Sequence, residues 1–298
     1  MGLSLSLPAT ALRAAALELV ILAGHLLLYP TGVFAERRPA GGRDGRENGH
    51  EGSSTARSGY REGSGERKDT RTDERGRTDV PLRPVAERPP VILLHGFTDN
   101  RSVFLLLRRA LTAHGGRHVE ALNYSPFTTD LRVAARLLGE HVEQVCARTG
   151  HDRVDLVGHS LGGLVARYYV QRLGGAERVR TVVTLGTPHG GTRVAPLMDA
   201  HPVVRQMRPD SPVLVELAAP APGCSTRFVS FWSDLDQLMV PLETARLDHP
   251  DLRTENVRVS GIGHLALAAH PAVTSRIRQA LDGPGDLDAA ASDSMSVA

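Results

Sequence analysis

The chain lacks several features that whole classes of protein require. It has two cysteines, Cys146 and Cys224, too few for a disulfide-dense scaffold or a zinc site made of cysteines alone. Its formal net charge is only +2, so no dominant basic field exists and nucleic-acid binding is not expected. The HxH and CxxC spacings of zinc sites are missing, as is a glycine-rich phosphate loop after a strand, so we expect no metal and no cofactor.

The sequence divides into four parts of different composition. Residues 1–35 are largely apolar, and residues 36–88 hold 13 Lys or Arg and 11 Asp or Glu with almost nothing apolar. Such a mixed-charge stretch cannot bury enough surface to offset the entropy of ordering, so we predict a disordered linker. Residues 89–282 form the one part able to hold a core and suit a single domain, expected to be monomeric. Residues 283–298 are predicted to be a disordered tail.

The apolar N-terminal segment permits three interpretations. The stretch from Ala14 to Ala35, broken only by Glu18, His25 and Pro30, just reaches the length of a membrane-spanning helix. It also suits a signal peptide cleaved after Ala35, or an amphipathic helix lying on a membrane or on the protein itself. The first two interpretations predict an extracytoplasmic protein, membrane-anchored or secreted, which meets the membrane surface through this segment.

Within residues 89–282, short apolar runs alternate with helical patterns. From Leu131 to Thr149 the apolar residues recur at helical spacing. Unbroken apolar strands separated by helices favour a mostly parallel sheet of about six strands with helices on both faces, which is an α/β fold. The expected strands are Val91–His95, His118–Tyr124, Val154–Val157, Val179–Leu185, Arg227–Trp232 and Val257–Gly261.

The most informative motif is G-x-S-x-G around Ser160, between an expected strand and an expected helix. A sharp strand-to-helix turn exposes the serine hydroxyl at the carboxyl edge of the sheet, and Gly158 and Gly162 permit the close backbone approach that this turn needs. A serine before a helix is otherwise a simple N-cap. The strand and helix on either side favour a nucleophile.

Three stretches, VILLHGFTDN, DLVGHSLGGLVARYY and LGTPHGGT, together resemble the α/β-hydrolases of the bacterial lipase type. The chain is similar to small actinobacterial lipases and esterases and to the minimal lipases of bacilli, from about Pro89 to Leu281. The resemblance implies a Ser-His-Asp triad and a neutral lipid or carboxylic ester as substrate. It also implies an oxyanion hole made by the backbone N–H groups of Phe97, after the first strand, and Leu161, after the nucleophile.

The same resemblance directs the search for the acid and the base, which follow the serine in the order acid, then histidine. After the fifth expected strand, Asp234 and Asp236 are both candidates, and the approach to Val-Pro favours Asp236. After the last strand, the pattern G-x-G-H favours His264 as the base. His95 and His159 are interpreted as scaffold of the site and His270 as structural, and His249 is expected in a surface turn.

We therefore expect a serine ester hydrolase, a lipase or carboxylesterase acting through an acyl-enzyme. A thioesterase, amidase or acyltransferase would use the same triad, and a non-catalytic binding module is the remaining alternative. Two structural questions stay open. The 34 residues between Thr192 and Arg227 suit either a small lid or a pocket wall, and Cys146 and Cys224 suit either a disulfide or free thiols.

Overall fold

The computed structural model describes residues 88–97, 99–113, 116–124, 129–193 and 201–294, with side chains up to residue 283, together with Ala16 and Val20. The expectations for the apolar N-terminal segment and the charged linker therefore lie outside the described residues, apart from those two positions. Among the described residues, no helix combines the length and the apolar character needed to cross a bilayer.

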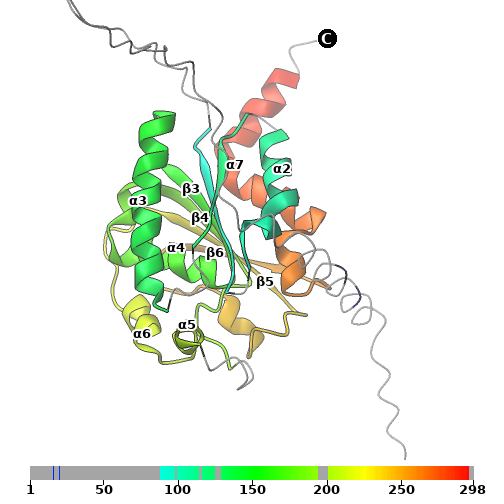
Figure 1. Cartoon of the computed structure of the whole chain (residues 1–298). Coiled ribbons are helices and arrows are strands. Elements are labelled where there is room, and N and C mark those ends of the chain that lie inside the picture. The colour runs from blue at the N-terminus through cyan, green and yellow to red at the C-terminus, as the bar shows by residue number, and fades with distance from the viewer. Residues whose placement is uncertain are drawn as a thin grey trace, which may run out of the picture. The chain divides into compact units, whose positions relative to one another are not determined.

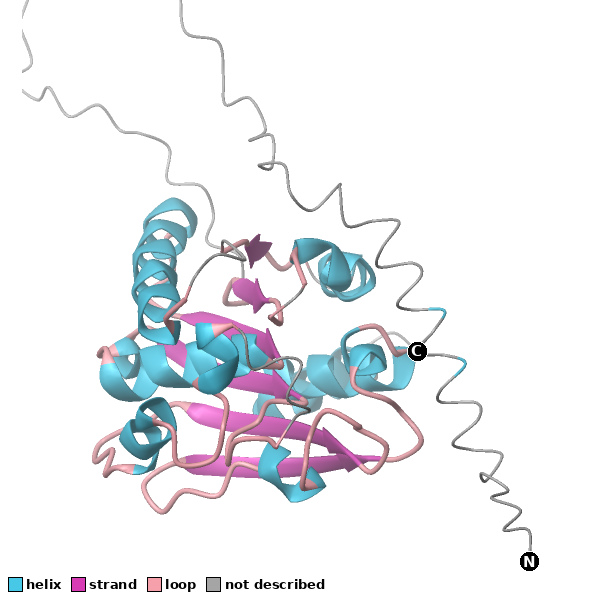
Figure 2. Ribbon diagram, turned by 60° about the horizontal axis from the view of Figure 1, so that its bottom comes forward, coloured by secondary structure: helices cyan, strands magenta, loops and turns pink. Residues whose placement is uncertain are grey.

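The centre of the described chain is a six-stranded sheet in which every neighbouring pair is parallel. The strand order is β2-β1-β3-β4-β5-β6. Figure 2 shows the strands lying between helices. The prediction of a mostly parallel α/β sheet of about six strands is confirmed. The strands are β1 (Val91–Leu94), β2 (Val119–Leu122), β3 (Val154–His159), β4 (Val179–Leu185), β5 (Arg227–Ser233) and β6 (Arg253–Val259).

Helices cover both faces of this sheet. Figure 1 shows α3 and α4 on one side and α2 and α7 on the other. A break at Gly283, with φ 76° and ψ 167°, divides α7 at the start of the segment expected to be a tail. The α-helices are α2 (Leu105–Ala113), α3 (Leu131–Thr149), α4 (Leu161–Arg172), α5 (Pro202–Arg205), α6 (Pro212–Ala218) and α7 (Pro271–Ser294). The 3-10 helices are η1 (Arg101–Phe104), η2 (Gly175–Glu177), η4 (Leu242–Ala245) and η5 (Leu265–Ala268).

Two hydrophobic cores explain why the strands are apolar throughout. Successive side chains of a strand point to opposite faces, so Ile92 and Leu94 of β1 pack under α3 and α4, whereas Val91 and Leu93 pack under α2 and α7. All four side chains are fully buried. A strand covered on both faces cannot show the alternation of a half-exposed strand, and this is why the sequence shows apolar runs.

Helix α3 spans the residues that its apolar spacing predicts. Its N-terminus is capped by Asp130, whose carboxylate accepts a hydrogen bond of 2.9 Å from the backbone N–H of Arg132. Its C-terminus ends at Gly150, which adopts the left-handed conformation with φ 74°. Local signals therefore define both ends of this helix.

Strand β6 differs most from expectation, because it begins at Arg253 rather than Val257. The added residues are Arg253, Thr254, Glu255 and Asn256, which carry no apolar pattern. β6 pairs with β5 alone and is the edge of the sheet, so its side chains are half-exposed and polar residues are tolerated there. A search for apolar runs therefore finds only the second half of the strand.

The segment left open as lid or wall is fixed to the body of the domain in its described part, residues 201–226. Glu216 of α6 accepts hydrogen bonds from Arg132 of α3 at 2.5 Å and from the Tyr168 hydroxyl of α4 at 2.6 Å. Val213 and Leu217, also of α6, are fully buried in the core shared with α3 and α4. Helix α6 is therefore part of the wall of the domain.

Candidate active site

Ser160 lies at the turn between β3 and α4, where the motif predicts it. Its backbone has φ 53° and ψ −121°, a conformation that L-residues rarely adopt. The residue stands at the N-cap position of α4, but its side chain makes no capping hydrogen bond. The interpretation as a simple helix cap is therefore wrong, and Ser160 instead lines a pocket.

The glycines on either side of Ser160 are required by close backbone contacts. A Cβ atom at Gly158 would lie 2.5 Å from the backbone nitrogen of Gly163, and one at Gly162 would lie 2.2 Å from the carbonyl oxygen of Leu94. No side chain fits at these distances. The tight packing of α4 against β1 and β3 thus holds the strained turn in place, as the sequence motif indicates.

His264 and Asp236 are brought together at the same edge of the sheet. Nδ1 of His264 lies 2.8 Å from Oδ2 of Asp236, and both side chains are buried. A carboxylate only accepts, so Nδ1–H donates and Nε2 keeps its lone pair. The other carboxylate oxygen, Oδ1, accepts from the backbone N–H groups of Leu238 and Met239 at 3.0 and 3.2 Å. Asp236 is thus fixed by its own loop and fixes the imidazole of His264.

Asp234, the other candidate for the acid, contacts residues just after and within β6. Its carboxylate accepts from the backbone N–H of Gly261 at 3.0 Å and from the Arg258 guanidinium at 3.2 Å. These contacts join the loop after β5 to the loop after β6. Asp234 therefore orders the turn, and Asp236 is the carboxylate that contacts the histidine.

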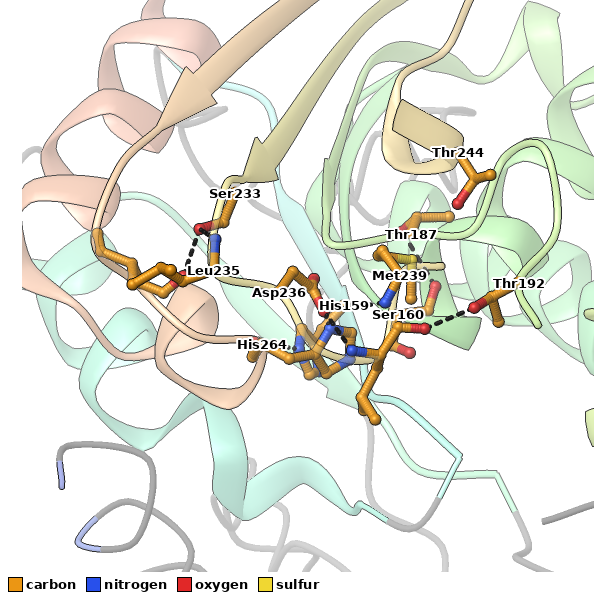
Figure 3. Close-up of polar contacts among 12 residues, drawn as sticks. His159, Ser160, Thr187, Thr192, Ser233, Leu235, Asp236, Met239, Thr244 and His264 are labelled. Carbon is orange, nitrogen blue, oxygen red and sulfur yellow. Dashed lines mark hydrogen bonds and ion pairs between the residues drawn. The ribbon is translucent and has the colours of Figure 1, made fainter. Parts of the chain in front are cut away.

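One pocket contains the serine, the histidine and the loop expected to provide the oxyanion hole. Ser160 and His264 both line this pocket (Figure 3). A Cβ at Gly96 would lie 3.4 Å from Cβ of Ser160, so the backbone just before Phe97 runs close to the serine. Leu161, which follows the serine, is the first residue of α4. The other lining residues are Gly96, Phe97, Asp99, His159, Pro188, Thr192, Met207, Leu238, Met239 and Leu265.

The other histidines occupy separate positions. His270 accepts from the backbone N–H of Ala272 at the start of α7, which agrees with a structural role. His249 accepts from the backbone N–H of Asp251 but is buried, so the expected surface position is wrong. His95 is buried at the end of β1, where its ring stacks on Tyr124 with centroids 4.1 Å apart. His159 is different, because its ring lies 4.7 Å from that of His264.

Two residues that sequence reasoning did not consider also shape the site. Asp99 contacts His159, with Oδ2 3.3 Å from Nδ1. The Thr192 hydroxyl donates to the Leu238 carbonyl at 2.6 Å and accepts from the Val240 N–H, so the loop after β4 is tied to the loop that carries Asp236. The contacting residues are 60 and 46 or more positions apart, and no local pattern signals them.

Cys146 is buried in α3 and Cys224 is partly buried, and both thiols are free. In the part of the chain that the structure describes, no three His, Cys, Asp or Glu side chains gather as a metal site would require.

The chain is similar in sequence to known hydrolases. A family model described as palmitoyl protein thioesterase matches residues 90–237. Triacylglycerol lipases of Pseudarthrobacter phenanthrenivorans and Burkholderia plantarii are each 37% identical over 118 residues, 37% of this chain. The matched region spans only 36% and 32% of the length of these relatives.

Solved structures support the fold. Aspergillus fumigatus lipase B superposes with a TM-score of 0.58 at 16% identity, covering 66% of this chain and 53% of that one. The propeptide form of Bacillus licheniformis lipase BlEst2 gives 0.54 at 16% identity, covering 65% and 50%.

A parallel sheet with a serine at a strained strand-to-helix turn, and a histidine–aspartate pair in the same pocket, defines an α/β-hydrolase. Within that superfamily the chain is similar to triacylglycerol lipases, and to the palmitoyl protein thioesterase family over the part that holds Ser160 and Asp236.

Proposed function

We propose that the protein is a serine hydrolase that cleaves carboxylic ester bonds of acyl lipids through an acyl-enzyme. One observation carries the proposal: Ser160 and His264 share one pocket, and the Asp236 contact leaves Nε2 of His264 as a proton acceptor. A serine hydroxyl is a weak nucleophile by itself and needs an adjacent base whose orientation a third group fixes.

The proposed reaction proceeds in two halves. The Ser160 hydroxyl attacks the ester carbonyl while Nε2 of His264 takes its proton, and Asp236 stabilises the imidazolium that forms. His264 then gives that proton to the departing alkoxide, leaving an acyl-Ser160 ester. Water, deprotonated by the same nitrogen, adds to the acyl carbon. The bond from that carbon to the Ser160 oxygen then breaks, His264 returns its proton to the serine oxygen, and a carboxylic acid is released.

The negative charge that develops on the carbonyl oxygen needs donors already in place. We assign this role to the backbone N–H groups of Phe97 and Leu161. Leu161 opens α4, so the positive end of the helix dipole adds to its effect. Removing one donor of an oxyanion hole typically costs about 10²–10³ in kcat, so these two amides would supply a large share of the acceleration.

The lining of the pocket favours an acyl chain. Five apolar side chains line the pocket together with Ser160: Pro188, Met207, Leu238, Met239 and Leu265. Triacylglycerols and simple acyl esters are therefore the proposed substrates, in agreement with the names of the curated relatives. Rates on nitrophenyl esters from acetyl to palmitoyl, measured below and above substrate aggregation, would separate a lipase from an esterase.

The direct test compares wild type with Ser160→Ala. We expect the variant to fold but to lose nearly all hydrolysis of nitrophenyl acyl esters, because no other group can form the acyl-enzyme. Unchanged turnover in the variant would refute the assignment of Ser160.

A thioesterase is the second candidate, because the matching family model is described as palmitoyl protein thioesterase. The same triad attacks a thioester, and the leaving thiolate needs less protonation than an alkoxide. Matched palmitoyl esters of an alcohol and of a thiol, compared by kcat/KM, would discriminate the two functions. An amidase or an acyltransferase would be revealed by amide substrates or by transfer to an added alcohol.

We further propose that the protein works as a monomer outside the cytoplasm, held at a membrane or secreted through residues 1–35. The apolar composition of that segment supports this proposal. Mass spectrometry of the native protein would show whether the chain starts at Met1 or after Ala35, and size-exclusion chromatography with light scattering would give its oligomeric state.

A further inference from the structure

His159, the residue immediately before Ser160, has no role in the reaction proposed above. Its side chain is fully buried at the end of β3. Nδ1 lies 3.3 Å from Oδ2 of Asp99, and Nε2 lies 3.1 Å from the main-chain carbonyl oxygen of His264. The ring thus stands between the loop after β1 and the residue that serves as the base (Figure 3 labels His159 and His264).

The two contacts determine how many protons the pair must hold. A carbonyl oxygen only accepts, so Nε2 of His159 carries a hydrogen. The contact at Nδ1 then needs a second hydrogen, either on Nδ1 facing an ionised Asp99 or on the carboxyl facing a neutral ring. If the ring were neutral and the carboxylate ionised, the lone pair of Nδ1 would face a lone pair of Oδ2, which is repulsive. Compared with a neutral imidazole and an ionised carboxylate, His159 and Asp99 together therefore hold one more proton. The pair then has no net charge.

We propose that His159 and Asp99 form a second histidine–carboxylate pair, which positions His264 through its main-chain carbonyl and must keep its shared proton for full activity. The inference rests on the proposed function, since His264 must be the base. His159 is a positioning residue, because it acts through the main chain of His264.

Several ionisable groups face His159 from the surrounding elements. Asp99 approaches from the loop after β1, His95 from the end of β1, Asp236 from the loop after β5 and His264 from the loop after β6. Burial lowers the pKa of His159, but the hydrogen bond and charge of Asp99, the His264 carbonyl and the charge of Asp236 outweigh it and raise the pKa above the ordinary value. The shift favours the protonated form of the pair, which loses its proton as the pH rises.

Loss of that proton has a predictable consequence for the oxyanion. Oδ2 of Asp99 lies 2.8 Å from where a Cβ of Gly96 would be, next to the amide of Phe97. A carboxylate there whose charge is no longer balanced by a protonated His159 opposes a second negative charge on the substrate carbonyl oxygen. Activity is thus expected to fall on the alkaline side as the pair deprotonates.

Two isosteric variants separate the two contacts of His159. His159→Gln places an amide nitrogen where Nε2 was and keeps the donor to the His264 carbonyl. His159→Asn places an amide nitrogen where Nδ1 was, so it keeps the contact with Asp99 and loses the contact with His264. We expect His159→Asn to lower kcat about 10²-fold with little change in KM, because a small misplacement of the base suffices for such a loss. His159→Gln should retain kcat within about tenfold of wild type. Equal kcat in the two variants would overturn the positioning role.

Asp99→Asn tests the proton. An asparagine amide can donate to a neutral Nδ1, so His159 can then hold the His264 carbonyl without an extra proton or a charge on Asp99. We expect the alkaline fall of kcat/KM seen in wild type to disappear in Asp99→Asn, with activity at neutral pH retained within about tenfold. The requirement for the shared proton would be overturned if kcat/KM fell at the same alkaline pH in wild type and in Asp99→Asn. It would also be overturned if wild type showed no alkaline fall.

A measurement on wild type needs no variant to fold. The ¹⁵N resonances of the buried His159 ring, assigned by labelling, should titrate above the ordinary histidine range of about 6.5. Titration at or below that value overturns the inference.

Labelling by a fluorophosphonate separates failure of this inference from failure of the proposed function. If Ser160 of wild type is not labelled, the proposed function is wrong and the inference falls with it. If wild type is labelled and His159→Asn reacts at the same rate, the hydrolase stands and the positioning role alone is overturned. We expect about 10²-fold slower labelling of His159→Asn.

Discussion

The imidazole of His264 donates from Nδ1 to Oδ2 of Asp236 over 2.8 Å, whereas Asp234, two residues earlier in the same loop, contacts Arg258 and the Gly261 amide. Asp234 and Asp236, two residues apart in the loop after β5, therefore have different structural roles. One fixes the tautomer of the proposed base, and the other joins two loops.

This division predicts different effects of two conservative substitutions. In Asp236→Asn the amide group donates to Nδ1, the ring takes its other tautomer, and Nε2 carries a hydrogen that prevents it from accepting the serine proton. We expect kcat on a nitrophenyl ester to fall by about 10⁴. Asp234→Asn should stay within a few-fold of wild type, because Asn retains an acceptor for the Gly261 N–H. A larger loss in Asp234→Asn would reverse the assignment of the acid.

The strained backbone of Ser160 predicts a gain in stability when its side chain is removed entirely. At φ 53° a Cβ is unfavourable, and glycine is free of that penalty. Ser160→Gly should therefore exceed Ser160→Ala in free energy of unfolding by about 1 kcal/mol, measured by urea denaturation. Ala166→Gly in the middle of α4 is the control, and glycine should destabilise it by about 1 kcal/mol or more. A less stable Ser160→Gly would show that the turn stores no strain.

The contact between α4 and the loop after β4 predicts a coupling between two sites. A Cβ at Gly163 would lie 2.0 Å from the Thr187 hydroxyl oxygen, whereas a Cβ at Gly162 meets the backbone of Leu94. We expect Gly163→Ala to cost about 2–3 kcal/mol. Adding Thr187→Ala should recover about 1 kcal/mol of that, since the hydroxyl is gone.

The matched background for this experiment is Gly162→Ala. The new Cβ at position 162 clashes with backbone, so adding Thr187→Ala should recover no stability in that background. It should instead lower the free energy of unfolding by about 1 kcal/mol, because the hydrogen bond from the Thr187 hydroxyl to the Ser160 carbonyl is lost. Strictly additive effects in the Gly163 pair, measured by denaturation of all four proteins, would contradict the expected steric conflict.

A buried ionic cluster at the opposite end of β3 predicts a loss of stability without a loss of chemistry. Asp155 is fully buried and accepts from Arg180 at 2.7 Å and from Arg117 at 3.3 Å, and Arg117 also contacts Asp282 of α7. Asp155→Ala should lower the free energy of unfolding by about 3–5 kcal/mol, because it leaves a buried guanidinium without one of its partners.

The control for that substitution is an exposed ion pair. Glu143→Ala removes the contact with Arg178, where both side chains are about half-exposed, and should cost less than about 1 kcal/mol. Activity per folded molecule should be unchanged in both variants. A similar cost for the two substitutions would show that burial adds nothing to the Asp155 cluster.

Features of this fold that depend on local pattern can be predicted from the order of the residues. Apolar runs identify the strands that are covered on both faces, and helical spacing with a cap and a terminal glycine defines α3 from Leu131 to Thr149. The glycines around Ser160 reveal the turn, because only a residue without a side chain permits the backbone approach found there. In a parallel sheet the carboxyl ends of the strands share an edge, which is why candidate residues after three separate strands could be placed in one site.

The partner that each side chain meets depends on the folded arrangement of the strands and loops. Asp234 and Asp236 lie in the same loop, and only the path of that loop turns one toward His264. The edge strand β6 starts earlier than its apolar residues suggest, because half-exposure removes the hydrophobic signal. His159 looked like scaffold, yet its two contacts lie 60 and 105 residues away. Contacts over such separations depend on how the strands pack and where their loops run, and a pattern of neighbouring residues carries no record of either.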